Sequence, residues 1–219
     1  VNISFFYPQA EKGKALGINA AGGNLGTGIV QLVVPLIITT GAGVALDRAG
    51  LIFVPAAILS ALAAFVFMNN LSHAKSALRS YALAVRNPHT WIISFLYIGT
   101  FGSFLGFSLT FPTLMESLHP DVPAALAFLG AATGALTRPF GGSLADRFGG
   151  TRVTMASYTA MAVGVVGLVL TVEDAGFALF LGLFLLLFAA AGIGNGSVYR
   201  MIPIAFQIGA TDEESRRRG

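Results

Sequence analysis

Six long apolar stretches, separated by mostly short polar breaks, restrict the fold of this 219-residue chain more than any other feature. About 20 apolar residues in a helix cross the hydrocarbon core of a bilayer, whereas a barrel strand needs about ten residues of alternating polarity. Because each stretch is long and continuously apolar, the sequence predicts an all-α, polytopic membrane protein with about six transmembrane helices. The stretches cover residues 15–39, 51–69, 90–115, 122–145, 153–172 and 177–206.

The low content of charge agrees with a membrane protein and excludes other classes. Only 11% of the residues are charged, against about a quarter in a soluble domain. Cysteine is absent, which excludes disulfides and thiolate metal sites. The net charge of +3 is scattered between apolar segments, so nucleic acid is not an expected partner. The sequence has no cluster of metal ligands, no nucleophile–base pair and no phosphate-binding loop, so neither an enzyme nor a cofactor is expected.

The basic residues alternate between successive polar breaks. One set of connections holds ten of them, and the other holds only Arg48 among mainly acidic residues. Cytoplasmic loops are enriched in lysine and arginine, so we expect the first set, and both ends of the chain, on the cytoplasmic side. The first set consists of Lys12, Lys14, Lys75, Arg79, Arg86, Arg147, Arg152, Arg216, Arg217 and Arg218.

The longest polar connection, residues 70–89, divides the chain into two predicted parts. Its basic residues fit a solvated cytoplasmic link between helical bundles, with a protein-binding segment as the alternative. Residues 1–69 are then the end of an N-terminal bundle, and residues 90–219 are part of a C-terminal bundle. The opening residues 2–8 resemble the last turns of a hydrophobic element, so an internal fragment of a larger membrane protein is expected.

Arg138 lies in the fourth apolar stretch, which carries no other charge. A guanidinium inside a membrane costs ~2.5 kcal/mol or considerably more, and it stays protonated. Such a group is expected to face a polar interior. Arg138 is therefore the main candidate for binding an anion.

Two further pairs of residues share a helix face with each other. Asn24 and Gln31 are seven apart in sequence, and buried amides need partners. An interhelical hydrogen bond or a polar ligand would satisfy them equally well. Tyr97 and Phe101, four apart, present two rings on one face. Packing is the usual role of such a pair, but the Tyr97 hydroxyl also needs a partner.

Small residues recur at intervals of four near the start of the first apolar stretch. Such patterns allow helix backbones to approach closely in lipid, and we expect that role for Gly17, Gly22, Gly23, Gly26 and Gly28. Near the end of the last stretch, Arg200 is expected to extend to the membrane interface.

The connection after the fourth stretch carries the spacing G-x-x-x-D-R-x-G-x-x-R. This spacing resembles the loop signature of the major facilitator superfamily. In that family the loop acts as a conformational latch between helices, which implies a gating role here. The residues concerned are Gly142, Asp146, Arg147, Gly149 and Arg152.

Several further segments resemble one branch of that superfamily, the nitrate/nitrite porter family. The run G-I-N-A-A-G-G-N-L-G at residues 17–26, followed by Gln31 and Pro35, looks like its nitrate signature. Four more segments resemble the same family in the same order, so the resemblance spans nearly the whole chain. They are N-I-S-F-F-Y-P at 2–8, Y-I-G-T-F-G-S-F at 97–104, G-A-L-T-R-P at 134–139 and G-I-G-N-G-S at 192–197.

The resemblance implies a partial major facilitator fold, running from the end of helix 4 through helix 10 of a twelve-helix porter. It implies a monomeric carrier in the cytoplasmic membrane that moves nitrate or nitrite by alternating access. Arg138 would be one of two substrate-binding arginines, with Asn24, Tyr97 and Phe101 lining the same site. The second arginine would lie on helix 2, outside this chain.

Two questions stay open at this level. The apolar stretches hold no Asp, Glu or His apart from residues at their ends, which favours nitrate/nitrite exchange over proton-coupled uptake. The alternatives are a major facilitator carrier for another small anion or an organic solute, and a membrane sensor or channel without a transport cycle.

Overall fold

The structure is a computed structural model that describes residues 7, 8, 11–41, 44–68, 85–171 and 176–218, with side chains described up to residue 204 except at residue 203. Every regular element in these ranges is helical. The predicted link at 70–89 lies outside the described residues except for 85–89. The helices are α1 (Lys12–Ile38), α2 (Asp47–Leu51), α3 (Phe53–Phe67), α5 (Pro88–Leu118), η3 (Ala124–Ala127), α6 (Phe128–Leu136), α7 (Arg138–Phe148), α8 (Gly150–Thr171) and α9 (Phe177–Arg218).

Five helical segments of the described chain are long and apolar enough to cross a membrane. Each corresponds to a predicted stretch, which confirms the all-α membrane class. The spans are Lys12–Ile38, Asp47–Phe67, Pro88–Leu118, Gly150–Thr171 and Phe177–Ile202.

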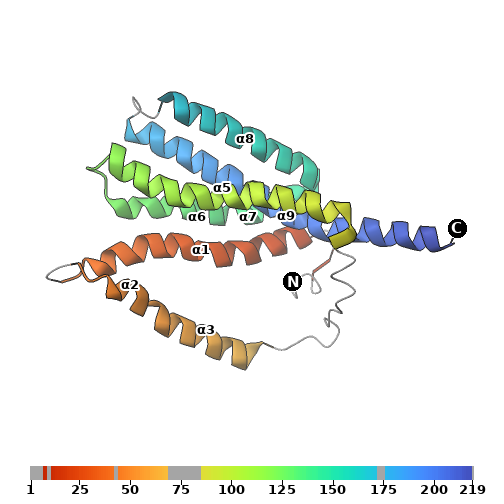
Figure 1. Cartoon of the computed structure of the whole chain (residues 1–219), viewed down its shortest axis with the longest axis horizontal. Coiled ribbons are helices and arrows are strands. Elements are labelled where there is room, and N and C mark those ends of the chain that lie inside the picture. The colour runs from red at the N-terminus through yellow and green to blue at the C-terminus, as the bar shows by residue number, and fades with distance from the viewer. Residues whose placement is uncertain (1–6, 9–10, 42–43, 69–84, 172–175, 219) are drawn as a thin grey trace.

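The fourth stretch, expected as one helix over 122–145, is divided into η3, α6 and α7. The break between α6 and α7 falls at Thr137, whose backbone keeps helical angles of φ −79° and ψ −12°. Pro139 explains the interruption, because it lacks the N–H that would bond the carbonyl of Ala135 and its ring crowds that carbonyl. The chain continues in the same direction through α7 (Figure 1), so this stretch is an interrupted helix.

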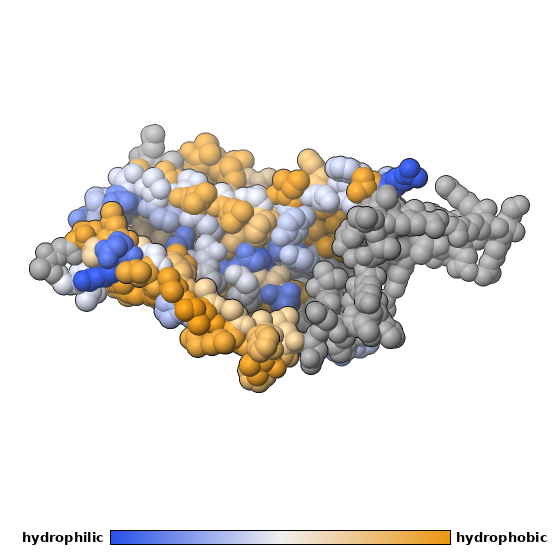
Figure 2. Space-filling model, turned by 60° about the horizontal axis from the view of Figure 1, so that its bottom comes forward, coloured by the Kyte–Doolittle hydropathy of each residue, from blue (hydrophilic) through white to orange (hydrophobic). Residues whose placement is uncertain are grey.

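The helices other than α2 and α3 lie side by side in one bundle, whereas α3 diverges from it (Figure 1). No residue of α3 is buried in the described part of the chain. Figure 2 shows this helix as a continuous apolar band on the surface. A helix that is apolar on all sides needs lipid or other helices around it.

Aromatic side chains form the core between α5 and α9. Phe111 contacts Phe180, Phe184 and Phe188 with ring centroids 4.7–6.0 Å apart, and all four rings are buried. Packing of this kind holds membrane helices together where lipid offers no hydrophobic drive. The core thereby fixes α5 against α9 on one side of α7.

Two glycines bring other helices against the backbone of Arg138. A Cβ on Gly196 of α9 would overlap the Arg138 carbonyl oxygen, and one on Gly17 of α1 would lie 2.8 Å from that oxygen. Only glycine permits such approaches. They place α1 and α9 on either side of the start of α7.

Candidate functional site

Arg138 is fully buried at the first turn of α7. Its Nη1 donates to the carbonyl oxygen of Ala20 in α1 at 3.2 Å. Its Nε and Nη2 are buried and have no partner among the described residues. In that part of the chain the single salt bridge joins Arg200 to Asp146, so no carboxylate neutralises Arg138. The site therefore presents a permanent positive charge with unused donors.

Three rings of α5 form a stacked row beside this guanidinium. The Tyr97 and Phe101 centroids lie 5.2 Å apart, and those of Phe101 and Phe104 lie 6.3 Å apart. The guanidinium carbon of Arg138 is 4.7 Å from the Phe104 centroid and 5.6 Å from that of Phe101. A cation over a desolvated ring gains ~2 kcal/mol. The rings hold the charged plane in place without occupying its donors.

Tyr97 also contacts α9. Its hydroxyl oxygen lies 3.3 Å from that of Tyr199, and the two rings meet edge to face at 5.6 Å. Both side chains border a pocket of about 320 Å³ that extends toward Thr90. The hydroxyl pair thus lies between this pocket and the aromatic row next to Arg138.

Asn24 reaches the same carbonyl as the arginine. Its Nδ2 donates to the Ala20 oxygen at 2.8 Å, so Asn24 and Arg138 converge on one acceptor. Gln31, for which the same two alternatives were open, donates to the Ser108 carbonyl of α5 at 2.9 Å. Of the two open alternatives, Gln31 takes the interhelical bond, whereas the bond of Asn24 lies within α1 and is neither of the two.

The five glycines expected to pack closely divide into two groups. Gly17 approaches Arg138, and a Cβ on Gly28 would lie 3.2 Å from the backbone nitrogen of Ala132 in α6. At the other three positions a Cβ would meet no described atom within 4 Å. Among the described residues, close packing is therefore absent at Gly22, Gly23 and Gly26.

Asp146 of the loop motif joins three helices. It accepts from the backbone N–H groups of Gly13 at 3.2 Å and Lys14 at 3.1 Å, which lie in the first turn of α1. It also accepts from Nε of Arg200 in α9 at 2.5 Å. A carboxylate satisfies the free N–H groups of a helix start and is favoured there by the helix dipole. Arg200, expected at the interface, pairs with Asp146 because that carboxylate lies within reach.

Arg147 and Arg152 form no salt bridge among the described residues. Arg147 lies over the Phe148 ring at 5.1 Å. Gly149 adopts φ +89° and ends α7, a conformation that glycine alone adopts freely. Among the motif residues, Asp146 thus makes the contacts between helices, and Gly149 makes the turn.

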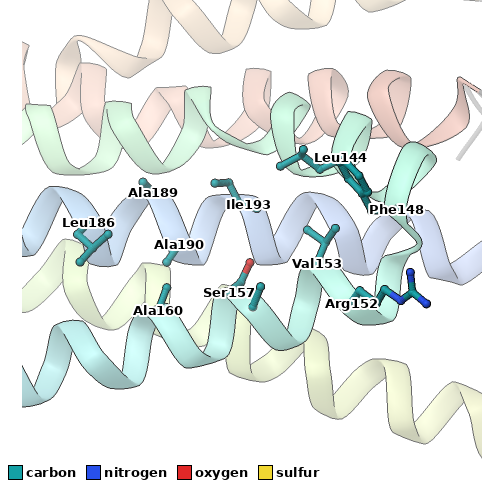
Figure 3. Close-up of a pocket in the computed structure, with 11 residues that line it drawn as sticks. Leu144, Phe148, Arg152, Val153, Ser157, Ala160, Leu186, Ala189, Ala190 and Ile193 are labelled. Atoms are coloured by element: carbon teal, nitrogen blue, oxygen red, sulfur yellow. The ribbon is translucent and has the colours of Figure 1, made fainter.

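The larger of the two described pockets, about 530 Å³, lies apart from Arg138, between α7, α8 and α9. Its lining is apolar except for Ser157 and Arg152 (Figure 3). Leu144, Phe148 and Ile193 project into it, and Arg152 lies at one end (Figure 3). A small anion finds no cluster of donors in this space.

Two residues of the site, Phe104 and Tyr199, and the nearby buried residue Asn195 were not singled out from the sequence. Phe104 continues the row of Tyr97 and Phe101, three residues beyond Phe101, and that spacing could have shown it. Tyr199 and Asn195 lie four apart on α9. Asn195 is an amide inside an apolar stretch, which could have singled it out as it did Asn24, whereas no sequence signal separates Tyr199 from an ordinary packing residue.

The interrupted helix, the buried arginine and the Asp146 junction define a polytopic membrane protein with a charged site inside its bundle. The family model of the Major Facilitator Superfamily matches residues 1–213, and the chain belongs to this superfamily.

Named relatives agree with the narrower resemblance seen in the motifs. The chain is 39% identical to "Nitrate/nitrite transporter NarU" of Salmonella typhimurium over 99% of its own length and 53% of the relative. It is 38% identical to the NarU protein of Escherichia coli over 94% of the chain and 49% of the relative. It is 35% identical to "Probable nitrate/nitrite antiporter NarK2" of Thermus thermophilus over 94% of the chain and 52% of the relative. The predicted resemblance to the nitrate/nitrite porter family is confirmed, and the chain spans about half the length of these relatives.

Proposed function

We propose that the full-length protein carries nitrate, nitrite or both across the cytoplasmic membrane by alternating access, with Arg138 as one substrate-binding arginine. One observation carries the proposal: Arg138 is buried without a carboxylate, and its Nε and Nη2 lack partners among the described residues. A guanidinium fork donates two parallel hydrogen bonds to two oxygens of a flat anion. Nitrate and nitrite both offer such a pair of oxygens, and the named relatives support this choice of substrate.

The surrounding residues complete a half-site for the anion. Asn24 lies next to the fork through the shared Ala20 carbonyl, and its amide can donate to a bound oxygen. The rings of Tyr97 and Phe101 supply positive edges. A second arginine, implied by the resemblance, belongs to the part of the protein beyond this chain.

Exchange of nitrate for nitrite fits the described spans better than proton coupling. Residues 128–145 and 177–199 hold no Asp, Glu or His, and such residues are the usual proton carriers inside membranes. An anion that replaces another keeps the charge on Arg138 balanced. We further propose a monomeric carrier with both ends of this chain in the cytoplasm, as the distribution of basic residues indicates.

The test uses the full-length protein in liposomes loaded with nitrite and supplied with external nitrate. Arg138→Lys keeps the charge but removes the fork. Because hydrogen bonds to charged groups contribute about 1.5–3 kcal/mol, we expect nitrate uptake to fall roughly 10- to 100-fold. The control is Arg48→Lys, since Arg48 is exposed and donates only to the carbonyl of Thr40 in the described chain.

Near-normal nitrate uptake by the Arg138→Lys protein would rule out the proposed role of the fork. Equal uptake with and without internal nitrite would argue against exchange. Equal competition by a simple carboxylate would favour a carrier for other anions.

A further inference from the structure

Asn195 of α9 is fully buried, and neither Nδ2 nor Oδ1 has a hydrogen-bond partner among the described residues. An amide buried without partners costs roughly 2–7 kcal/mol. Binding a partner at this amide would therefore recover a large free energy. The amide needs one partner that accepts from Nδ2 and one that donates to Oδ1, and these can be different groups.

The position of Asn195 on its helix places it opposite the aromatic row. It lies seven residues after Phe188 and four before Tyr199, so the three side chains share a helix face. Phe188 contacts Phe104 at 5.9 Å, and Tyr199 contacts Tyr97 at 5.6 Å. Asn195 therefore faces α5 between these two contacts, at the level of Phe101.

The neighbours of Asn195 in sequence confirm which helices meet there. A Cβ on Gly194 would lie 2.9 Å from Cγ2 of Thr100 in α5, and one on Gly196 would overlap the carbonyl oxygen of Arg138 in α7. Asn195 thus lies at the junction of α5, α7 and α9. The guanidinium of Arg138 lies over the Phe101 and Phe104 rings of the same α5 segment.

We propose that Asn195 is a further anion-contacting residue that favours nitrate over nitrite, an inference that rests on the proposed function. The Arg138 fork takes two oxygens of the anion, and Nδ2 of Asn195 donates to the third oxygen, which nitrate has and nitrite lacks. Oδ1 of Asn195 accepts from an N–H of Arg138 that is unpaired in this structure, and so orients the fork. The bound anion and this contact between the two side chains together satisfy the orphaned atoms of Arg138 and Asn195.

The test compares variants of the full-length protein in liposomes, with nitrate and nitrite as separate substrates. Asn195→Leu keeps the branched shape of the side chain but removes both polar atoms. We expect the KM for nitrate to rise about tenfold or more, the KM for nitrite to change less than about threefold, and kcat to stay within about twofold. Asn195→Ser, which can still donate and accept, is expected to recover most of the affinity for nitrate.

The matched control is Ser197→Ala, two residues further along α9. Ser197 is equally buried, but its hydroxyl is satisfied by Thr154 at 2.7 Å and by the Gly194 carbonyl at 2.8 Å. Its loss is expected to lower thermal stability without changing the preference between the two anions. The unfolding temperature without nitrate measures the stability of each variant, and its rise on adding nitrate measures binding. Asn195→Ala gives the same readout if the leucine variant fails to fold.

Equal changes in KM for both anions, or no change for either, would overturn the inference, because a packing role cannot distinguish two oxygens from three. Absence of nitrate and nitrite flux in the wild-type protein would instead overturn the proposed function itself. If the wild-type protein transports both anions and the Asn195→Leu protein has the same KM values, only the role of Asn195 is rejected.

Discussion

Arg138 brings a permanent charge into the bundle, where it meets one carbonyl oxygen and two ring faces. A cation–π contact gains ~2 kcal/mol, and a charge-assisted hydrogen bond about 1.5–3 kcal/mol. Together these offset the lower estimate of ~2.5 kcal/mol for an arginine inside a membrane. Two nitrogen atoms remain free of partners among the described residues. The arginine is thus tolerated before any anion binds, yet can still bind one.

The contribution of the ring face can be measured at Phe104. Phe104→Leu keeps an apolar side chain but removes the face 4.7 Å from the guanidinium. We expect the KM for nitrate to rise roughly 10- to 30-fold, in line with the loss of up to ~2 kcal/mol of cation–π energy. Phe184→Leu is the control, because Phe184 is buried in the same core and packs on Phe111 and Phe180. A similar rise in KM for both variants would assign Phe104 to packing alone.

At the scale of elements, small residues decide how α7 sits between α1 and α9. The Arg138 carbonyl lies so close to Gly196 that a methyl group there would overlap it. Backbone cannot move aside as a flexible side chain can, so any larger residue must displace α9. The position of the guanidinium relative to α5 thus depends on glycines of other helices.

Gly196→Ala is expected to lower the thermal stability of the full-length protein and reduce nitrate uptake, because overpacking costs about 1–3 kcal/mol. Gly182→Ala on the same helix is the control, since a Cβ there meets nothing within 4 Å in the described chain. Thermal unfolding in detergent and uptake in liposomes measure both effects. Unchanged stability in the Gly196→Ala protein would show that α7 and α9 separate easily.

The elements themselves were largely predictable from sequence, because span length follows directly from bilayer thickness. Pro139 also marks the interruption of the fourth stretch, once its missing N–H is considered. The partner of Asp146 was not predictable. Arg200 lies 54 residues away, and its pairing depends on the relative rotation of α7 and α9, which periodicity does not encode. For the same reason, the sequence does not show that the Asn195 amide has no hydrogen-bond partner among the described residues.

At the scale of the whole molecule, Asp146 ties α1, α7 and α9 together at one end of the bundle. Alternating access requires helices on either side of a central site to separate on one face while they close on the other. When these helices separate, the contacts of Asp146 with α1 and α9 are expected to break together. For the proposed carrier we therefore expect Asp146 to bias the balance between the two conformations more than it affects the anion site.

Asp146→Asn keeps the shape of the side chain but removes its charge. We expect kcat for nitrate/nitrite exchange to change several-fold while the KM for nitrate stays within about twofold. The pair with Arg200 and the favourable interaction with the start of α1 are both weakened. Glu116→Gln is the control, because Glu116 is exposed and has no salt bridge among the described residues. A change in KM alone would place Asp146 in the binding site.

The carbonyl of Ala20 has more donors than it can accept. Nη1 of Arg138 and Nδ2 of Asn24 both donate to it, and in a helix it also receives the backbone N–H four residues later. An oxygen with two lone pairs cannot serve three donors fully. The guanidinium bond is the longer of the two side-chain bonds, 3.2 Å against 2.8 Å. In the proposed carrier, an arriving anion can therefore draw the guanidinium away from Ala20 while the carbonyl oxygen stays satisfied, so we expect this contact to slow turnover little.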